Sequence, residues 1–258
     1  MKKLLLASLL TVSGAAFAGG SGVVGSVSDV PDHDASSESG WNASIGLGVV
    51  NAPTFAGVDD TESTGVPLIN VSYNDTFYFE YNKLGAWVWK PDDTGFRIGV
   101  VVQPRKGYDK GDGPIEGREI DDTGLAGVRM KWQSGKFGID ASLLGSSEED
   151  SGGEVHITAK YTFLASAKGS LTAMVKLESM SEDAVDYFYY SGGVDTEGFS
   201  PDSATNASVG VIGTYNLTPR WMLIGAVKAT SYDDSISDAP GVTEDSGTTA
   251  LVGATYKF

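Results

Sequence analysis

Apolar and polar residues alternate along most of the chain from Trp41 to Phe258, and this period of two predicts β-strands. In segment 95–104 the apolar row is Phe96, Ile98, Val100 and Val102, and the polar row is Arg97, Gly99 and Gln103. The same pattern predicts strands at 41–50, 67–73, 76–82, 84–90, 95–104, 121–133, 136–145, 154–163, 170–178, 206–217, 220–231 and 247–258. The chain is therefore predicted to be all-β.

Charged residues inside these segments fall on the polar row. The bases on that row are Arg97, Arg129, Lys131, Lys160, Lys176 and Lys228, and the acids are Glu80, Asp140 and Glu178. A Lys or Arg on the lipid face near mid-bilayer costs about 2–4 kcal/mol, so this segregation favours an apolar row facing lipid and a polar row facing an enclosed lumen. A soluble β-sandwich would also alternate, but its apolar row would face a protein core.

Short and long connections alternate between the predicted strands. The short turns are 74–75, 91–94, 134–135, 164–169 and 218–219, and the long loops are 51–66, 105–120, 146–153, 179–205 and 232–246. This rhythm is typical of outer-membrane barrels with short periplasmic turns and long extracellular loops. It holds when 76–90 forms two strands with a tight outer turn near Asn82-Lys83, which predicts a transmembrane antiparallel up-and-down β-barrel of about twelve strands. Ten strands is the alternative, because this turn has the weakest signal.

Aromatic residues gather at the periplasmic ends of the predicted strands, on the apolar row. They are Trp41, Tyr73, Phe77, Trp89, Phe96, Trp132, Phe137, Tyr161, Phe163, Tyr215, Trp221, Tyr256 and Phe258, and they include four of the five tryptophans. Such rings form girdles at the level of the lipid headgroups. A strand that ends on an aromatic residue is the usual ending of outer-membrane barrels, so Tyr256 and Phe258 are the predicted barrel-insertion signal.

The first forty residues differ from the rest. Lys2 and Lys3 precede an apolar stretch, and a small-residue site follows, which predicts a signal peptide over 1–18 with cleavage between Ala18 and Gly19. Residues 19–40 lack periodicity and predict a flexible periplasmic N-terminal arm, and 41–258 is the predicted barrel. After the signal no apolar run approaches the ~20 residues of a membrane helix, so spanning requires a closed barrel. The predicted location is the outer membrane of a Gram-negative cell.

The net charge of the chain limits the classes of molecule that it is expected to bind. The chain has a net charge of −16 and no cysteine, so we expect neither nucleic-acid binding nor disulfides. The predicted long loops carry most of the acids and only four bases, Arg105, Lys106, Lys110 and Arg118. Outer-membrane lipid and lipopolysaccharide are the expected surroundings. These acids could bind Mg²⁺ or Ca²⁺ ions that bridge them to lipid phosphates. The favoured interpretation is that they keep the loops soluble and resistant to aggregation.

Residues that could carry chemistry are few. His156 is predicted to point into the lumen beside Glu154, with Ser146, Ser147 and Ser151 in the preceding loop. A Ser–His–acid site is defined by geometry, but no motif supports one here, and a hydrogen-bonded lumen histidine is the favoured interpretation. Asp32-His33-Asp34 is interpreted as a solvated run. No catalytic, metal or cofactor-binding residue is therefore predicted.

The loop segment 186–194 is unusually aromatic. Tyr187, Phe188, Tyr189 and Tyr190 follow one another in it, which predicts a plug in the barrel mouth or, as the alternative, a contact surface. The lumen of a twelve-stranded barrel is wider than side chains alone fill in eight-stranded ones. Since the predicted lumen bases outnumber the acids, an open pore would favour anions, whereas paired charges would close it. The sequence leaves both possibilities open.

Several of these segments together resemble the MipA/OmpV family of outer-membrane proteins. The resemblance covers nearly the whole chain from Trp41 and rests on Ile45-Gly46-Leu47-Gly48, Pro53-Thr54-Phe55-Ala56-Gly57, Pro67-Leu68-Ile69, the aromatic stretch 187–194, Leu217-Thr218-Pro219-Arg220-Trp221 and the final 251–258. Two departures are visible: Phe55 stands where the family usually has tyrosine, and Asp238-Ala239-Pro240 where Asp-Ser-Pro is more common. Neither affects the expected fold.

The resemblance implies a non-enzymatic barrel with a structural, scaffolding or interaction role. Members of the family are described as linking a lytic transglycosylase to a murein synthase, and others as surface adhesins. A scaffold would use the N-terminal arm and the periplasmic turns, whereas an adhesin would use the long loops. A narrow channel for small anionic solutes is the other alternative.

Overall fold

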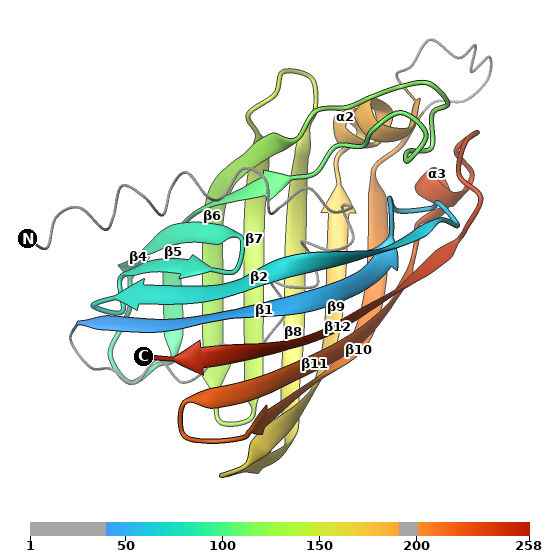
Figure 1. Cartoon of the computed structure of the whole chain (residues 1–258). Coiled ribbons are helices and arrows are strands. Elements are labelled where there is room, and N and C mark those ends of the chain that lie inside the picture. The colour runs from blue at the N-terminus through green and yellow to red at the C-terminus, as the bar shows by residue number, and fades with distance from the viewer. Residues whose placement is uncertain (1–39, 191–200) are drawn as a thin grey trace, which may run out of the picture.

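Consecutive antiparallel strands close on themselves when β1 pairs with β12, so the chain forms a barrel (Figure 1). The structure is a computed structural model that describes residues 40–190 and 201–258. Within these residues the strands are β1 Trp41–Pro53, β2 Thr61–Tyr73, β3 Phe77–Glu80, β4 Lys83–Trp89, β5 Phe96–Arg105, β6 Thr123–Ser134, β7 Phe137–Ser146, β8 Gly153–Ser166, β9 Gly169–Met180, β10 Ala204–Asn216, β11 Trp221–Ser231 and β12 Ser246–Lys257. The predicted twelve-stranded up-and-down barrel is confirmed, and the ten-stranded alternative is wrong.

Three short helices lie in the described parts of the long loops. They are α2 Glu182–Val185, the π-helix η1 Asp186–Tyr190, and α3 Asp234–Ser237. Ser181 caps α2 by accepting a hydrogen bond from the Ala184 amide, and Asp233 caps α3 by accepting one from the Ser235 amide. In outer-membrane barrels the short turns face the periplasm, so we name the two ends of the barrel the periplasmic end and the outer end. No helix among the described residues is long and apolar enough to cross a bilayer.

The β3–β4 hairpin is much shorter than its neighbours. Its turn is Tyr81-Asn82, one residue before the predicted position, and Tyr81 has a φ of 56°. β3 pairs with β2 only over Asn70–Tyr73, so the outer part of β2 has no β3 partner. The predicted outer turn therefore lies part of the way up the wall, with Tyr81 and Asn82 buried.

The outer surface of the barrel carries the apolar row. Val100, Val175 and Val209 are each more than half exposed although they are valines in the middle of strands, as expected for side chains solvated by lipid. The aromatic residues line up across neighbouring strands at the periplasmic end. Ring pairs there include Trp41–Tyr73 at 4.8 Å and Phe137–Tyr161 at 4.7 Å between centroids.

The fifth tryptophan, Trp87, points the other way. A register shift in the β4–β5 ladder separates Trp87 from Trp89, so that Trp87 is buried and stacks on Tyr78 at 4.8 Å, while Trp89 faces outward. A bulge of this kind re-aims a side chain by adding one residue to a strand.

Part of the lumen is apolar, contrary to the expectation of a polar row on every strand. We call this group the lumen cluster: Val50, Ala52, Val66, Leu68, Tyr81, Met222, Ile224 and Leu251. It joins inward positions of β1, β2, β11 and β12 to the tip of the β3–β4 hairpin. Apolar side chains thus fill one side of the interior, and polar residues occupy the other.

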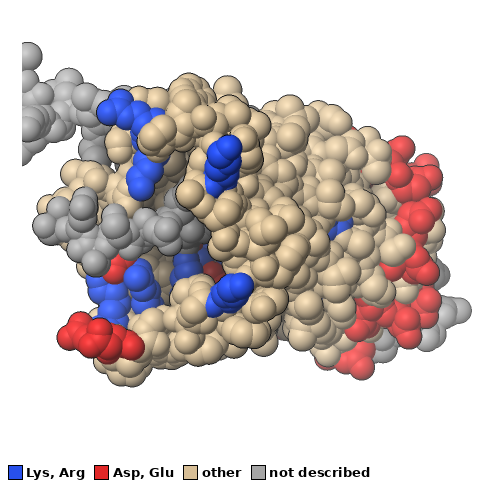
Figure 2. Space-filling model, turned by 90° about the horizontal axis from the view of Figure 1, so that it is seen from below, with Lys and Arg blue, Asp and Glu red and all other residues tan. Residues whose placement is uncertain are grey.

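Charge separates along the barrel axis. Figure 2 shows acidic side chains along one end, mostly basic side chains with a few acidic ones at the other, and a band with little charge between them. In the described parts of the long loops only Lys106, Lys110 and Arg118 are basic. The predicted signal peptide with Ala18 and Gly19, the run 32–34 and all of the arm except Gly40 lie outside the described residues.

Candidate functional site: the lumen and its cap

Arg129 is the centre of an ion-pair cluster toward the periplasmic end of the lumen. It extends from β6, is only 2% exposed, and binds Asp140 of β7 and Glu80 of β3, the latter at 2.6 Å. Its guanidinium also lies over the rings of Tyr78 and Trp87, at 5.1 and 5.3 Å from their centroids. Because Glu80 comes from a strand that is not adjacent to β6, this pair ties two parts of the wall together across the lumen.

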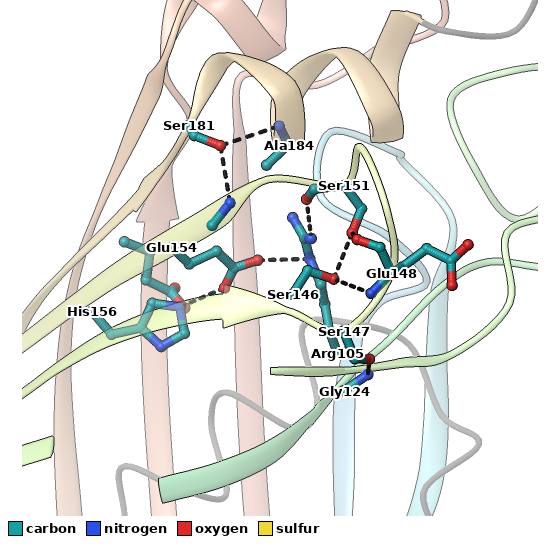
Figure 3. Close-up of polar contacts among 12 residues, drawn as sticks. Arg105, Gly124, Ser146, Ser147, Glu148, Ser151, Glu154, His156, Ser181 and Ala184 are labelled. Carbon is teal, nitrogen blue, oxygen red and sulfur yellow. Dashed lines mark hydrogen bonds and ion pairs between the residues drawn. The ribbon is translucent and has the colours of Figure 1, made fainter. Parts of the chain in front are cut away.

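A second cluster lies nearer the outer end. Glu154 of β8 accepts from Arg105 Nε at 2.8 Å and lies 2.7 Å from His156 Nε2 (Figure 3). Arg105 also donates to the Ser151 carbonyl at 2.6 Å, and its guanidinium covers the Phe188 ring at 4.2 Å. Lys176 and Glu178 of β9 form a further pair at 2.8 Å. The pair Arg105–Glu154 also joins non-adjacent strands, β5 and β8.

The geometry around His156 differs from that of a hydrolase. Its ring nitrogen Nε2 lies 2.7 Å from the Glu154 carboxylate and 3.9 Å from that of Glu178. Ser146 and Ser151 instead bind each other through their hydroxyls, and Ser147 accepts from the Gly124 amide (Figure 3). Among the described residues no hydrogen bond joins His156 to these serines, so no nucleophile–base pair is assembled.

The long loops pack together above the second cluster. We call this group the cap cluster: Phe55, Tyr108, Ile120, Val185, Phe188, Tyr189, Tyr190, Ala204, Ile236 and Ala239. Phe55 stacks on Phe188 at 5.9 Å and meets Tyr108 edge to face at 5.0 Å. The Tyr190 hydroxyl donates to the Ser235 carbonyl at 2.9 Å, which links η1 to α3. Tyr187 lies at the edge of the cluster, and residues 191–194 of the aromatic stretch are outside the described residues.

Tyr108 connects two loops of the cap cluster, and its phenol should make the stability of the folded barrel depend on pH. Its hydroxyl donates to the Phe188 carbonyl at 3.1 Å, and burial raises the pKa of its phenol from 10.0 to about 12. The folded state holds the phenol proton of Tyr108 more tightly than the unfolded state does. The neutral phenol therefore contributes its full stabilisation of the folded barrel below pH 10, and this contribution is lost as the pH rises through about 12. Subtracting the phenolate absorbance titration of Tyr108→Phe from that of the unaltered chain should give a midpoint near 12. A midpoint near 10 would contradict this prediction.

The predicted lumen bases occupy different depths. Arg129, Lys176 and Lys228 are buried. Arg97 pairs with Asp75 at the periplasmic turn and is about a third exposed, and Lys131 lies 3.9 Å from Glu80. Lys160 is half-buried on β8 toward the periplasmic end.

Two further bases, Arg105 and Lys83, point inward although the sequence pattern does not predict it. The pattern places Arg105 in a long loop and Lys83 in an outer turn, but both are buried. The signal that could have found Arg105 is its spacing of two from the inward Gln103.

A cavity of about 160 Å³ lies between the tip of the β3–β4 hairpin and the cap cluster. Its lining includes Asn82 from the hairpin, Gln103 and Arg105 from β5, and Phe188 and Tyr189 from the cap. On the far side the lining residues are Glu154, His156, Lys176, Glu178 and Lys228. Among the described residues no group of His, Cys, Asp or Glu has the geometry to hold a metal ion.

The periplasmic end carries a ring of basic residues. We call it the basic rim: Lys90, Arg97, Lys136, Lys168, Arg220 and Lys257. Lys136 and Lys168 stand in the β6–β7 and β8–β9 turns and are exposed. The nearby acids are Asp75, which pairs with Lys90 and Arg97, and Asp92 and Asp93. The rim is therefore basic in a chain whose net charge is −16.

These features define a barrel of the outer-membrane type, with paired charges and apolar side chains in its lumen and packed loops over its mouth. The chain belongs to the family described as MltA-interacting protein MipA, whose model matches residues 45–258. The MltA-interacting proteins of Escherichia coli (strain K12) and Shigella flexneri are each 25% identical to it over 234 residues, which cover 87% of this chain and 92% of theirs.

Solved structures with a similar course include a NanC porin and an outer membrane channel from Pseudomonas putida F1. The first is 11% identical with a TM-score of 0.42 and covers 84% of this chain and 100% of its own. The second is 10% identical with a TM-score of 0.41 and covers 88% of this chain and 100% of its own.

Proposed function

We propose that the chain is a closed, non-enzymatic outer-membrane barrel that acts as an interaction protein for a murein-processing enzyme in the periplasm, with a lytic transglycosylase as the expected partner. Membership of the family supports this role, because the relatives from Escherichia coli and Shigella flexneri carry the name MltA-interacting protein. The basic rim supplies the surface on which such a partner would bind.

The filled lumen is the observation that carries the proposal. Arg129 and Arg105 each form an ion pair with a carboxylate on a non-adjacent strand, and the lumen cluster fills the opposite side. The aromatic residues Tyr187, Phe188, Tyr189 and Tyr190 belong to the cap over the outer mouth. These groups favour a closed scaffold over a channel. Planar-bilayer recordings of the pure protein should therefore show no conductance steps.

The basic rim predicts how the partner binds. Exposed bases attract an acidic surface and raise the association rate, and salt weakens this attraction. An enzyme that binds here should present carboxylates around its contact area. The predicted barrel-insertion signal, Tyr256 and Phe258, would hold this end of the barrel at the periplasmic surface of the membrane.

Charge reversal on the rim tests the proposal. We expect the double variant Lys136→Glu, Lys168→Glu to bind a lytic transglycosylase of the same organism at least tenfold more weakly than the unaltered barrel, measured by biolayer interferometry in detergent. Neither residue has an ion pair with another described residue, so folding should be unaffected.

The matched control is Lys110→Glu, an exposed lysine of a long loop at the other end, which should bind as the unaltered barrel does. Equal binding by the rim variant and the control would exclude the rim as the contact surface. If the unaltered barrel captures no murein enzyme from solubilised envelopes, the proposed role itself is wrong.

A further inference from the structure

Three buried polar residues at the lumen cavity have side-chain atoms without a partner. They are Asn82 Oδ1, Gln103 Oε1 and Arg105 Nη2, and none of these atoms has a hydrogen-bond partner among the described residues. The residues are 6%, 7% and 6% exposed, and all three line the same cavity. An unpaired buried polar atom is destabilising, because it has lost its hydrogen bonds to water and gained none in the protein. Three of them at one cavity indicate a place built to receive polar groups from outside the chain.

The three atoms require different hydrogen-bond partners. The two amide oxygens are acceptors and need donors such as hydroxyl or amino groups, whereas the guanidinium nitrogen is a donor and prefers an oxygen anion. Arg105 is already held in place, because Glu154 binds its Nε and the Ser151 carbonyl binds its Nη1. Its remaining nitrogen is therefore positioned rather than mobile.

The charges around the cavity favour an anion. Its lining contains four bases, Arg105, Lys106, Lys176 and Lys228, and two acids, Glu154 and Glu178. The cavity volume of about 160 Å³ is suitable for a small solute; an engineered cavity of about 150 Å³ holds benzene. Aromatic faces from Phe188 and Tyr189 close the outer side.

We propose that this cavity is a binding site for a small organic carboxylate that also carries hydroxyl groups, a three-carbon hydroxy acid such as glycerate being the expected class. The carboxylate binds Arg105, and the hydroxyls donate to Asn82 and Gln103. The site is separate from the basic rim, so this proposal is independent of the interaction with a murein enzyme, and either can fail alone.

The test uses glycerate with two matched solutes. Glycerol has the same carbon chain without the carboxylate, and propionate has the carboxylate without the hydroxyls. The full barrel is refolded from urea in the presence of radiolabelled glycerate, so that entry does not depend on opening of the cap, and binding is measured by equilibrium dialysis. We expect saturable binding of glycerate at one site per barrel. Glycerol and propionate should compete at least tenfold more weakly.

Variants locate the site. Gln103→Leu removes an unpartnered acceptor and should weaken glycerate binding about tenfold, and Gln103→Glu, which adds a like charge, should weaken it further. Gln133→Leu is the control, because Gln133 lies exposed at the periplasmic end of β6. Heat-modifiable gel migration verifies that each variant folds, and the comparison of solutes on the unaltered barrel stands without them.

Three results would overturn the proposal: no saturable glycerate binding, equal competition by glycerol or propionate, or equal weakening by the Gln103 and Gln133 variants. The first would mean that water alone satisfies these atoms.

Discussion

Replacing Arg129 with alanine should destabilise the barrel by about 3–5 kcal/mol, because it leaves the carboxylates of Glu80 and Asp140 buried without their counter-charge. Arg129 is 2% exposed, and the two carboxylate side chains are 12% and 14% exposed, so water can compensate little of the loss. The same change also removes the cation from the faces of Tyr78 and Trp87. The measurement is urea unfolding of the barrel in lipid vesicles, followed by tryptophan fluorescence.

Arg97→Ala is the matched control. Arg97 pairs with Asp75 at the periplasmic turn, where both side chains are a quarter to a third exposed, so the loss should stay below about 1 kcal/mol. Adding Glu80→Gln and Asp140→Asn to Arg129→Ala should recover part of the lost stability, because no uncompensated charge then remains. Similar losses for the two arginines would show that the Arg129 cluster is hydrated and does not seal the lumen.

An arginine at Val175 should cost about 2–4 kcal/mol of stability in a bilayer. Val175 lies in the middle of β9 between Ala159 of β8 and Val209 of β10, and its side chain is 52% exposed on the outer surface. This prediction tests the lipid-facing assignment directly, since the same substitution on a water-exposed strand face would change stability little. Urea unfolding in vesicles gives the value.

Leu217→Arg serves as the comparison. Leu217 is also outward and 55% exposed, but it follows β10 at the periplasmic end, where the cost of arginine falls to about 0–1 kcal/mol. Nearly equal costs at the two sites would contradict the placement of the apolar band in the membrane.

The outward face was predictable because it follows from the period of two, and the count of twelve followed from the alternation of short and long connections, which divides 76–90 into two strands. One row of every spanning strand must be apolar to face lipid, and the signal repeats twelve times, so errors at single residues do not accumulate. The aromatic residues at the strand ends added a second, independent signal. The turn Tyr81-Asn82 was located to within one residue by the alternation of short and long connections.

The inward face was only partly predictable. Met222, Ile224 and Leu251 occupy inward positions although they are apolar, because the interior here is packed against Tyr81 rather than filled with water. No local pattern indicates which inward positions touch across a lumen. The bulge that turns Trp87 inward is likewise a property of the β4–β5 ladder, not of the β4 sequence alone.

The cavity was not predictable for a related reason. Asn82, Gln103 and Arg105 meet because β3 and β4 stop short and β5 continues past them. The sequence indicates where a hairpin turns, but the height of that turn relative to the next strand depends on register, which the paired ladders set.

The short β3–β4 hairpin also leaves part of β2 without a neighbouring strand on one side. β3 and β4 end beside Asn70 and Val102, while β2 extends to Thr61 with no β3 partner there. Lipid offers no hydrogen-bond partners to backbone groups on such an edge, so they must be satisfied within the protein. The long loop that follows β5 should therefore shield this edge from the bilayer, and shortening that loop would expose it.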